Sequence, residues 1–381
     1  MKKIFRKIYE YVINPPGDEE LSKAWQVSHN KLPTLWLLGK TGSGKSSIVQ
    51  KMTGETAAEI GNGFMPCTQD ASGYDYPADL PIIRFMDTRG LGESAYNPAE
   101  DLASLGGSSQ ALLIVMRLRD GEQSSVLDAI KEISESDSRI RREHAVVVHT
   151  AASEISDEHD RQRAVAEKQA MVEKIWGKAL DHCVVDFSET TVEGELNDFG
   201  ADALNDIISK KMPALTLWLQ KNEHEDNEQT NFGRLMTEVL SYAGVAAASD
   251  TLPAVGLFSV PAIQGKMLHS LAQHYGIEWN VRNFTEFTGA LGVNVVLWYA
   301  ASFGGRQLVK MIPAYGQIVG GAVAFTVSYT STYAIGRAAC SYLYHKKTNT
   351  PLPDNALEDV YKEAMKQSKA AKKELKQERN T

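Results

Sequence analysis

Residues 39–47 read Gly39-Lys40-Thr41-Gly42-Ser43-Gly44-Lys45-Ser46-Ser47 and fit the pattern G-x-x-x-x-G-K-[ST]. An apolar run ends at Leu38, and a helix-like run over 47–52 follows. Glycines let a backbone wrap closely around phosphates, and N–H groups at a helix N-terminus favour negative charge. Lys45 would reach the β- and γ-phosphates, and the Ser46 hydroxyl would ligate Mg²⁺. The stretch therefore predicts a loop in which residues 39–47 bind nucleotide phosphates.

Short apolar runs alternate with helix-like stretches from residue 32 to about residue 219. The alternation predicts an α/β domain with a mostly parallel sheet flanked by helices. The expected strands are 35–38, 82–86, 111–116, 145–148 and 183–185, and the clearest helices are 124–133 and 157–176.

A second motif, Asp87-Thr88-Arg89-Gly90, follows the predicted strand 82–86. In this D-x-x-G pattern Asp87 would hold Mg²⁺ through water, and the Gly90 N–H would sense the γ-phosphate. Between the two motifs, Thr68 lies in a polar stretch and is placed to be a second Mg²⁺ ligand. The alternative for Thr68 is an ordinary loop threonine, since loops carry threonine freely.

In their order and spacing these three motifs resemble those of Ras-like small GTPase domains, most closely the Era/EngA/TrmE/septin-like branch. The resemblance covers residues 30–220 and implies a GTPase domain that binds GTP and GDP with Mg²⁺. Lys45, Asp87 and Gly90 would carry the hydrolysis. Leu91 stands where Ras-like proteins have a catalytic glutamine, so the intrinsic hydrolysis should be slow and need a partner or a homodimer.

The fourth motif departs from this family. The family has [NT]-K-x-D, whose aspartate accepts the guanine N–H groups, whereas this chain reads His149-Thr150-Ala151-Ala152-Ser153. A serine is a weaker acceptor than a carboxylate. His149 and Thr150, together with Ser188 after the last strand, are the candidates for holding the base. Alternatively, His149 only ends a strand, because a lone histidine carries little information.

The C-terminal part is predicted to be all-α. A polar, acidic linker at 221–231 precedes residues 232–345, which look helical throughout and resemble a bacterial domain of uncharacterised function found in YcjF-like inner-membrane proteins. Two stretches without charge, 287–305 and 311–336, are long enough to cross a bilayer but only moderately apolar. They leave open either membrane embedding or a helical bundle in water. A charged helical tail occupies 352–381.

Residues 1–16 are predicted to form a short basic amphipathic helix, suited either to an anionic membrane surface or to packing on the protein. The net charge of −8 argues against general nucleic-acid binding. Three widely separated cysteines give no disulfide framework or zinc site, which fits the cytoplasm. The expected location is the cytoplasm or the inner membrane, and the expected partners are a guanine nucleotide, the inner-membrane surface or a membrane protein, and a second copy of the chain.

Three functions are compatible with these features. The first is a GTP-binding switch with slow Mg²⁺-dependent hydrolysis, coupled to the helical domain. The second is a P-loop ATPase or another NTPase of non-guanine specificity, which the missing aspartate allows. The third is a non-enzymatic, membrane-associated structural protein that binds nucleotide only to fold.

Overall fold

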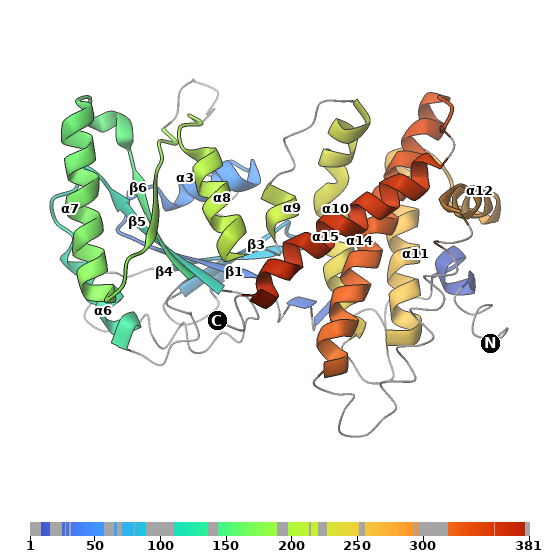
Figure 1. Ribbon diagram of the computed structural model, residues 1–381, viewed down its shortest axis with the longest axis horizontal. Helices are drawn as coiled ribbons and strands as arrows, with labels where there is room; N and C mark the ends of the chain where they lie inside the picture. Colours follow the sequence, from blue (N-terminus) through green and yellow to red (C-terminus); the bar gives the residue numbers. More distant parts are fainter. Residues whose placement is uncertain are drawn as a thin grey trace. The chain divides into compact units, whose positions relative to one another are not determined.

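The computed structural model describes residues 9–15, 25–26, 28–29, 32–56, 65–66, 71–79, 81–88, 110–135, 144–188, 197–212, 215–219, 227–250, 256–292, 295, 319–353 and 355–377. The chain divides into two compact units (Figure 1). The first, 31–219, contains the sheet. The second is helical and combines residues 1–30 with 220–381.

The unit 31–219 is built on a seven-stranded sheet of order β2-β3-β4-β1-β5-β6-β7. Strands β4, β1, β5, β6 and β7 are parallel, and β3 and β2 add an antiparallel edge. The predicted fold class, a mostly parallel sheet flanked by helices, is confirmed. The strands are β1 (Thr34–Leu38), β2 (Met65–Pro66), β3 (Ala71–Tyr76), β4 (Ile83–Thr88), β5 (Gln110–Arg117), β6 (Ala145–Thr150) and β7 (Asp181–Val184), and the helices are α3 (Lys45–Thr53), α6 (Ser124–Glu135), the 3₁₀ turn η2 (Ala152–Glu154), α7 (Glu158–Trp176), α8 (Ala201–Lys211) and α9 (Thr216–Leu219).

The core of this unit explains why the central strands are mostly apolar. A parallel strand covered on both faces has no position that faces water, and every residue of β1 is buried. Alternate residues form one continuous cluster with the inner faces of α6 and α7. The cluster includes Trp36, Leu38, Leu112, Ile114, Val147, Ile130, Val172 and Trp176.

The antiparallel pair β2–β3 was not predicted from the sequence. Strand β3 reads Ala-Ser-Gly-Tyr-Asp-Tyr and lacks the apolar run of a central strand. It pairs with β4, and one of its side chains, Asp75, makes a bidentate ion pair with Arg84 on that neighbour at 2.5 and 2.7 Å. Such cross-strand pairing stabilises a strand of mixed polar and apolar residues, which periodicity alone does not reveal.

The regular secondary structure among the described residues of the second unit is all helical, as predicted. Its helices are α10 (Asn227–Asp250), α11 (Gly256–His274), α12 (Val281–Leu291), α14 (Val319–Thr348) and α15 (Ala356–Gln377). Small residues let α10 and α14 approach closely: a Cβ on Gly336 would lie 2.5 Å from Val239 Cγ1. In the charged helix α15 the apolar stripe is buried at Leu357, Tyr361 and Ala364.

Polar side chains are buried between these helices. Ser328 on α14 donates to Asp250 Oδ2 on α10 at 2.5 Å, and Gln264 on α11 donates to Thr332 Oγ1 at 2.9 Å. Among the described residues no helix has both the length and the apolarity needed to span a membrane. Residues 293–294, 296–305 and 311–318 of the two charge-free stretches lie outside the described residues.

The predicted linker 221–231 ends earlier than expected, because α10 begins at Asn227. Glu228 in its first turn accepts two hydrogen bonds from Arg337 of α14, at 2.5 and 2.8 Å. The same guanidinium lies 4.7 Å from the ring centroid of Phe232. Glu228 therefore belongs to a largely buried ion pair of the helical unit, while residues 221–226 lie outside the described residues.

Residues 9–13 of the N-terminal segment are helical and pack on the helical unit. Val12 and Ile13 are buried, and the ring of His269 lies 2.8 Å through Nε2 from the Ile13 carbonyl oxygen. A Cβ on Gly265 of α11 would lie 2.6 Å from the Tyr11 carbonyl oxygen. Residues 9–13 therefore pack on the protein, which is one of the two alternatives expected for the N-terminal helix. Residues 1–8 lie outside the described part.

This close approach gives a first prediction. Gly265→Ala should destabilise the helical unit by about 1–3 kcal/mol, because the methyl group must displace the backbone of residues 11–12. Gly289→Ala is the matched control: a Cβ there meets nothing within 4 Å, and alanine favours a helix by up to about 1 kcal/mol. Urea denaturation of the full chain measures both, and equal stability of the two variants would contradict the packing.

Candidate functional site

The loop between β1 and α3 has a backbone that only glycine satisfies at its first position. A Cβ on Gly39 would lie 2.6 Å from the Val115 carbonyl oxygen of β5 and 2.7 Å from Ser43 Oγ. Gly42 and Gly44 adopt φ of +78° and +98°, in the left-handed region that favours glycine. The predicted loop is therefore a tightly wrapped turn at the carboxyl end of the central strand.

Helix α3 begins at Lys45, directly after this turn. Among the described residues no side chain caps its N-terminus at Gly44, and the first N–H groups of a helix have no partner within the helix. The Ser43 hydroxyl oxygen is also buried and has no hydrogen-bond partner in the described part of the chain. These donors make the turn suited to an anion.

The Lys45 side chain folds back over the same turn. Its Nζ donates to the carbonyl oxygens of Gly39 and Lys40, at 2.6 and 3.0 Å, and lies 3.6 Å from Asp87 Oδ1. Burial lowers the pKa of Lys45, and the Asp87 charge and hydrogen bond oppose that shift. A lysine from the start of α3 and a carboxylate from the end of β4 thus meet beside the turn.

Oxygen ligands for a divalent cation are available at this place. The Asp87 carboxylate lies at the end of β4, where Asp87 pairs with Leu37 of β1, and the exposed side chain of Ser46 lies in the first turn of α3. Hydroxyl and carboxylate oxygens are the donors that Mg²⁺ prefers, so the two residues fit a magnesium ion. The other predicted residues here, Thr68 and Gly90, and also Leu91, lie outside the described residues.

Thr150 of the fourth motif lies against the phosphate loop. Its Oγ1 donates to the Ser43 carbonyl oxygen at 2.6 Å, and a Cβ on Gly44 would lie 3.3 Å from its Cγ2. The chain then turns through Ala151, whose φ of 57° and ψ of 49° are left-handed, into the 3₁₀ turn η2. The structure therefore brings the fourth motif and the phosphate loop together.

The ring of His149 points in the opposite direction from Thr150. It is fully buried beneath α7, with Nε2 3.2 Å from Gln169 Oε1 and the His182 ring 5.8 Å away between centroids. Burial lowers the pKa of His149 to about 4, although the Gln169 hydrogen bond opposes the shift. This position is that of a residue ending a buried strand, and a role for His149 in base recognition stays a prediction.

Sequence reasoning missed three charged residues at this edge. Arg117 at the end of β5 makes a bidentate ion pair with Glu154 of η2 and donates from Nη1 to the Gly42 carbonyl oxygen at 3.3 Å. Asp186 accepts from the backbone N–H groups of Ser153 at 2.6 Å and Ser188 at 3.0 Å. The Ser188 side chain itself is exposed.

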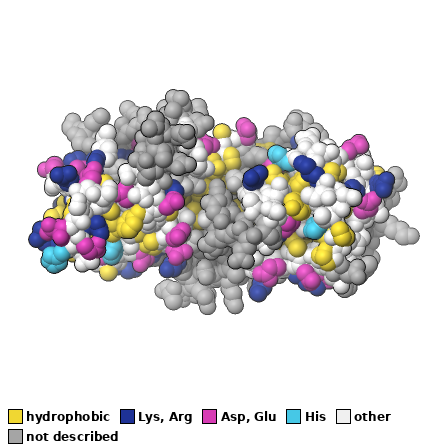
Figure 2. Space-filling model, turned by 90° about the horizontal axis from the view of Figure 1, so that it is seen from above, with side chains coloured by type: hydrophobic (Ala, Val, Ile, Leu, Met, Phe, Trp, Pro, Cys, Tyr) yellow, Lys and Arg dark blue, Asp and Glu magenta, His cyan; other side chains and the backbone are white. Residues whose placement is uncertain are grey.

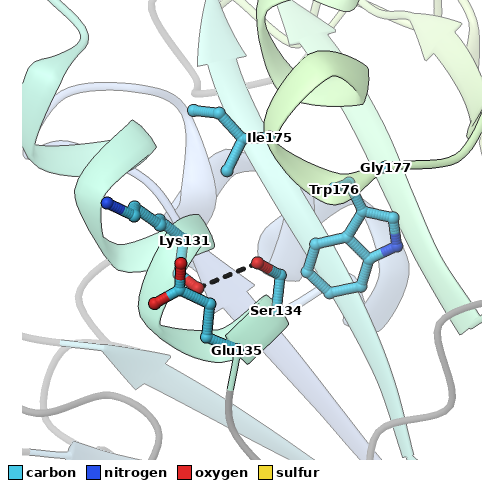
Figure 3. A pocket seen from close by; sticks show the side chains of 6 residues that line it. All are labelled: Lys131, Ser134, Glu135, Ile175, Trp176 and Gly177. Carbon is cyan, nitrogen blue, oxygen red and sulfur yellow. Dashed lines mark hydrogen bonds between the residues drawn. The ribbon is translucent and has the colours of Figure 1, made fainter.

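A shallow pocket lies at the other end of the sheet unit (Figure 3). Its walls are the last turn of α6 and the end of α7, with the Ser134 hydroxyl donating to the Lys131 carbonyl oxygen at 2.8 Å. Because α7 ends just before β7 begins, this pocket is at the edge where the parallel strands start. It is therefore separate from the predicted nucleotide site. Its lining residues are Lys131, Ser134, Glu135, Ile175, Trp176 and Gly177.

Comparison with known proteins finds a family match for part of the sheet unit. Residues 34–152 match the family described as 50S ribosome-binding GTPase. No curated protein matches the chain. A solved structure of a bacterial selenocysteine-specific elongation factor, EF-Sec, is similar over 48% of this chain and 28% of that chain, with 18% sequence identity and a TM-score of 0.33. The chain thus spans less than a third of that factor's length.

The family match over residues 34–152 and the geometry of the turn together support a P-loop GTPase domain within the sheet unit. The narrower resemblance to the Era/EngA/TrmE/septin-like branch, and that of the C-terminal part to YcjF-like proteins, stay predictions.

The buried His149 gives a second prediction. With a pKa of about 4 in the folded state against an ordinary 6.5, the folded state binds fewer protons than the unfolded state below pH 6.5. Stability should therefore fall as the pH is lowered, and His149 should account for about 2 kcal/mol between pH 7.5 and pH 5.

Urea denaturation across this pH range checks the expectation. His149→Gln should flatten the pH dependence, whereas His159→Gln, which changes an exposed histidine of α7, should leave it unchanged. The same slope in wild-type protein and His149→Gln would show that His149 does not titrate as its burial implies.

Proposed function

We propose that the protein is a GTP-binding switch that hydrolyses GTP slowly and signals its nucleotide state through the helical unit. The observation that carries this proposal is the meeting of Lys45 and Asp87, 3.6 Å apart, beside a glycine turn that precedes a helix N-terminus. The family match over residues 34–152 supports GTP and GDP as the ligands and Mg²⁺ as the accompanying ion.

Each of these groups has a separate role in the proposal. The N–H groups of residues 42–47 and Lys45 bind and orient the phosphates, and the Ser46 hydroxyl and Asp87 hold Mg²⁺, with Thr68 as a further ligand. Bound Mg²⁺ supplies charge neutralisation between the phosphates. The Gly90 N–H senses the γ-phosphate, so the segment that follows β4 responds to hydrolysis.

Guanine is the proposed base, with Thr150 and the 151–154 turn on one side and Ser188 on the other. One feature favours the alternative of a P-loop ATPase: Ser153 stands where the family's base-reading aspartate is expected, and the nearby Glu154 carboxylate is engaged by Arg117. Adenine does not present the paired N–H donors that such a carboxylate binds. Competition between GTP and ATP for the site therefore distinguishes a GTPase from an ATPase.

Slow hydrolysis follows from Leu91, since an apolar side chain cannot orient a water molecule as glutamine does. A partner protein or a second copy of the chain would then supply the group that orients the attacking water. The third reading, a protein that binds nucleotide only to fold, differs from this one in having no turnover at all.

Membrane attachment stays a prediction and is not part of the evidence for the switch. Polar side chains are buried between the helices of the second unit, and residues 12–13 at the N-terminus are buried on α11. Lysine and arginine side chains are interspersed with acidic ones on the face seen in Figure 2. The proposed output of the helical unit is therefore contact with a partner, for which the membrane is one setting.

The third prediction tests the phosphate loop. Lys45→Ala should weaken Mg²⁺–GDP binding by about 1.5–3 kcal/mol, because a charge-assisted phosphate contact is lost in a largely buried position. Lys51→Ala removes a lysine from the last turn of the same helix, where it pairs with Asp198, and should bind as the wild type does. Titration calorimetry measures both, and unchanged affinity in Lys45→Ala would refute the site.

The fourth prediction concerns the base and the rate. GTP should displace a fluorescent guanine nucleotide at a lower concentration than ATP does. The rate of GTP hydrolysis should lie well below about 1 s⁻¹. Asp87→Ala should abolish this turnover. Equal or tighter binding of ATP would favour the ATPase, and complete absence of turnover in the wild type would favour the non-enzymatic reading.

A further inference from the structure

Asp186 joins two loops that are distant in the sequence. Its Oδ2 accepts the backbone N–H of Ser153 in η2 at 2.6 Å, and its Oδ1 accepts the backbone N–H of Ser188 at 3.0 Å. The residue is only 2% exposed. One buried carboxylate therefore holds the loop after β6 and the loop after β7 in a fixed relation.

The carboxylate is suited to this double role because it is ionised. Burial alone would raise the pKa of Asp186, but the hydrogen bonds from Ser153 and Ser188 outweigh burial and lower it. Each oxygen accepts one N–H group, so an acceptor without charge or without two oxygens cannot replace it. The backbone on either side is also fixed, since Asp186 N donates to the Phe199 carbonyl oxygen at 2.9 Å.

The loop after β6 has no aspartate at the position where the family's fourth motif binds guanine. Ser153 replaces the expected aspartate, and Ala151 replaces the expected lysine. Two hydrogen bonds connect this region to the phosphate turn: Thr150 donates to the Ser43 carbonyl oxygen, and Arg117, which pairs with Glu154 in the loop after β6, donates to the Gly42 carbonyl oxygen. Between the described residues of the two loops, Asp186 then provides the side-chain link, next to the backbone hydrogen bond from Val185 N–H to the His149 carbonyl oxygen at 2.8 Å.

We propose that Asp186 is the positioning residue of the base-binding site: it acts through the backbone of Ser153 and Ser188 to shape a slot for the base where the fourth motif has no carboxylate. This inference rests on the proposed function, because it assumes that nucleotide phosphates bind at the Gly39–Ser47 turn. It predicts that Asp186 matters for the nucleoside part of the ligand and not for its phosphates.

The test compares two probes on the full-length protein, Mg²⁺–GTP and Mg²⁺ with inorganic triphosphate. Asp186→Asn keeps the shape but turns an amide N–H group toward one of the two donors. It should weaken GTP binding roughly tenfold or more while changing triphosphate binding by less than about twofold. Asp181→Asn, at the exposed start of β7 where Asp181 pairs with Lys211, is the matched control and should affect neither probe.

The outcomes separate the two proposals. Loss of GTP affinity alone supports the inference. Equal losses for both probes, or no loss for either, overturn it while the phosphate site stands. Wild-type protein that binds neither probe overturns the proposed function, and the inference falls with it.

A measurement on the wild type covers the case in which Asp186→Asn does not fold. Amide hydrogen exchange of the nucleotide-free protein should be slow at both Ser153 and Ser188, because the carboxylate already holds both N–H groups. Exchange at the rate of a free loop at either residue would overturn the proposal.

Discussion

Strand β1 is paired on both edges, with β4 on one side and β5 on the other, and this double pairing determines where the chemistry lies. Because all three strands are parallel, their carboxyl ends meet at one edge. The turn after β1 is then held between Asp87 at the end of β4 and the Val115 carbonyl oxygen of β5. A ligand at a place where neighbouring strands diverge in their connections is typical of open α/β sheets.

The loops after β6 and β7, which carry the proposed base-binding residues, depend on hydrogen bonds between residues that are far apart in the sequence. Thr150 binds the carbonyl oxygen of Ser43, Arg117 binds that of Gly42 together with the Glu154 carboxylate, and Asp186 binds two N–H groups. Buried polar groups are costly unless they are paired, so each contact favours one arrangement of the loops. Residues 150–154 and 186–188 are thus organised before any ligand arrives, which lowers the entropy cost of binding.

Sequence alone predicted the central strands, helices α6 and α7, and the helical character of the second unit, because apolar runs and helical periodicity are local signals. It missed β3, whose polar residues are stabilised by pairing with β4. It also placed Glu228 in a linker. In the structure Glu228 lies in the first turn of α10 and pairs with Arg337, more than a hundred positions later in the sequence. Asp186 and Arg117 were missed for the same reason: their partners are backbone groups of other loops, and only the fold brings them together. His149 was recognised as a notable residue, yet only the structure shows that its ring lies beneath α7.

The most direct test of the central claim, that the turn after β1 receives the nucleotide phosphates, is amide hydrogen exchange of the full-length protein with and without Mg²⁺–GDP. The account predicts that slowed exchange on binding is largest at residues 42–47, where the N–H groups of the turn and of the first turn of α3 meet the phosphates. Binding of GDP with no change at these amides, and protection confined to another part of the chain, would contradict it.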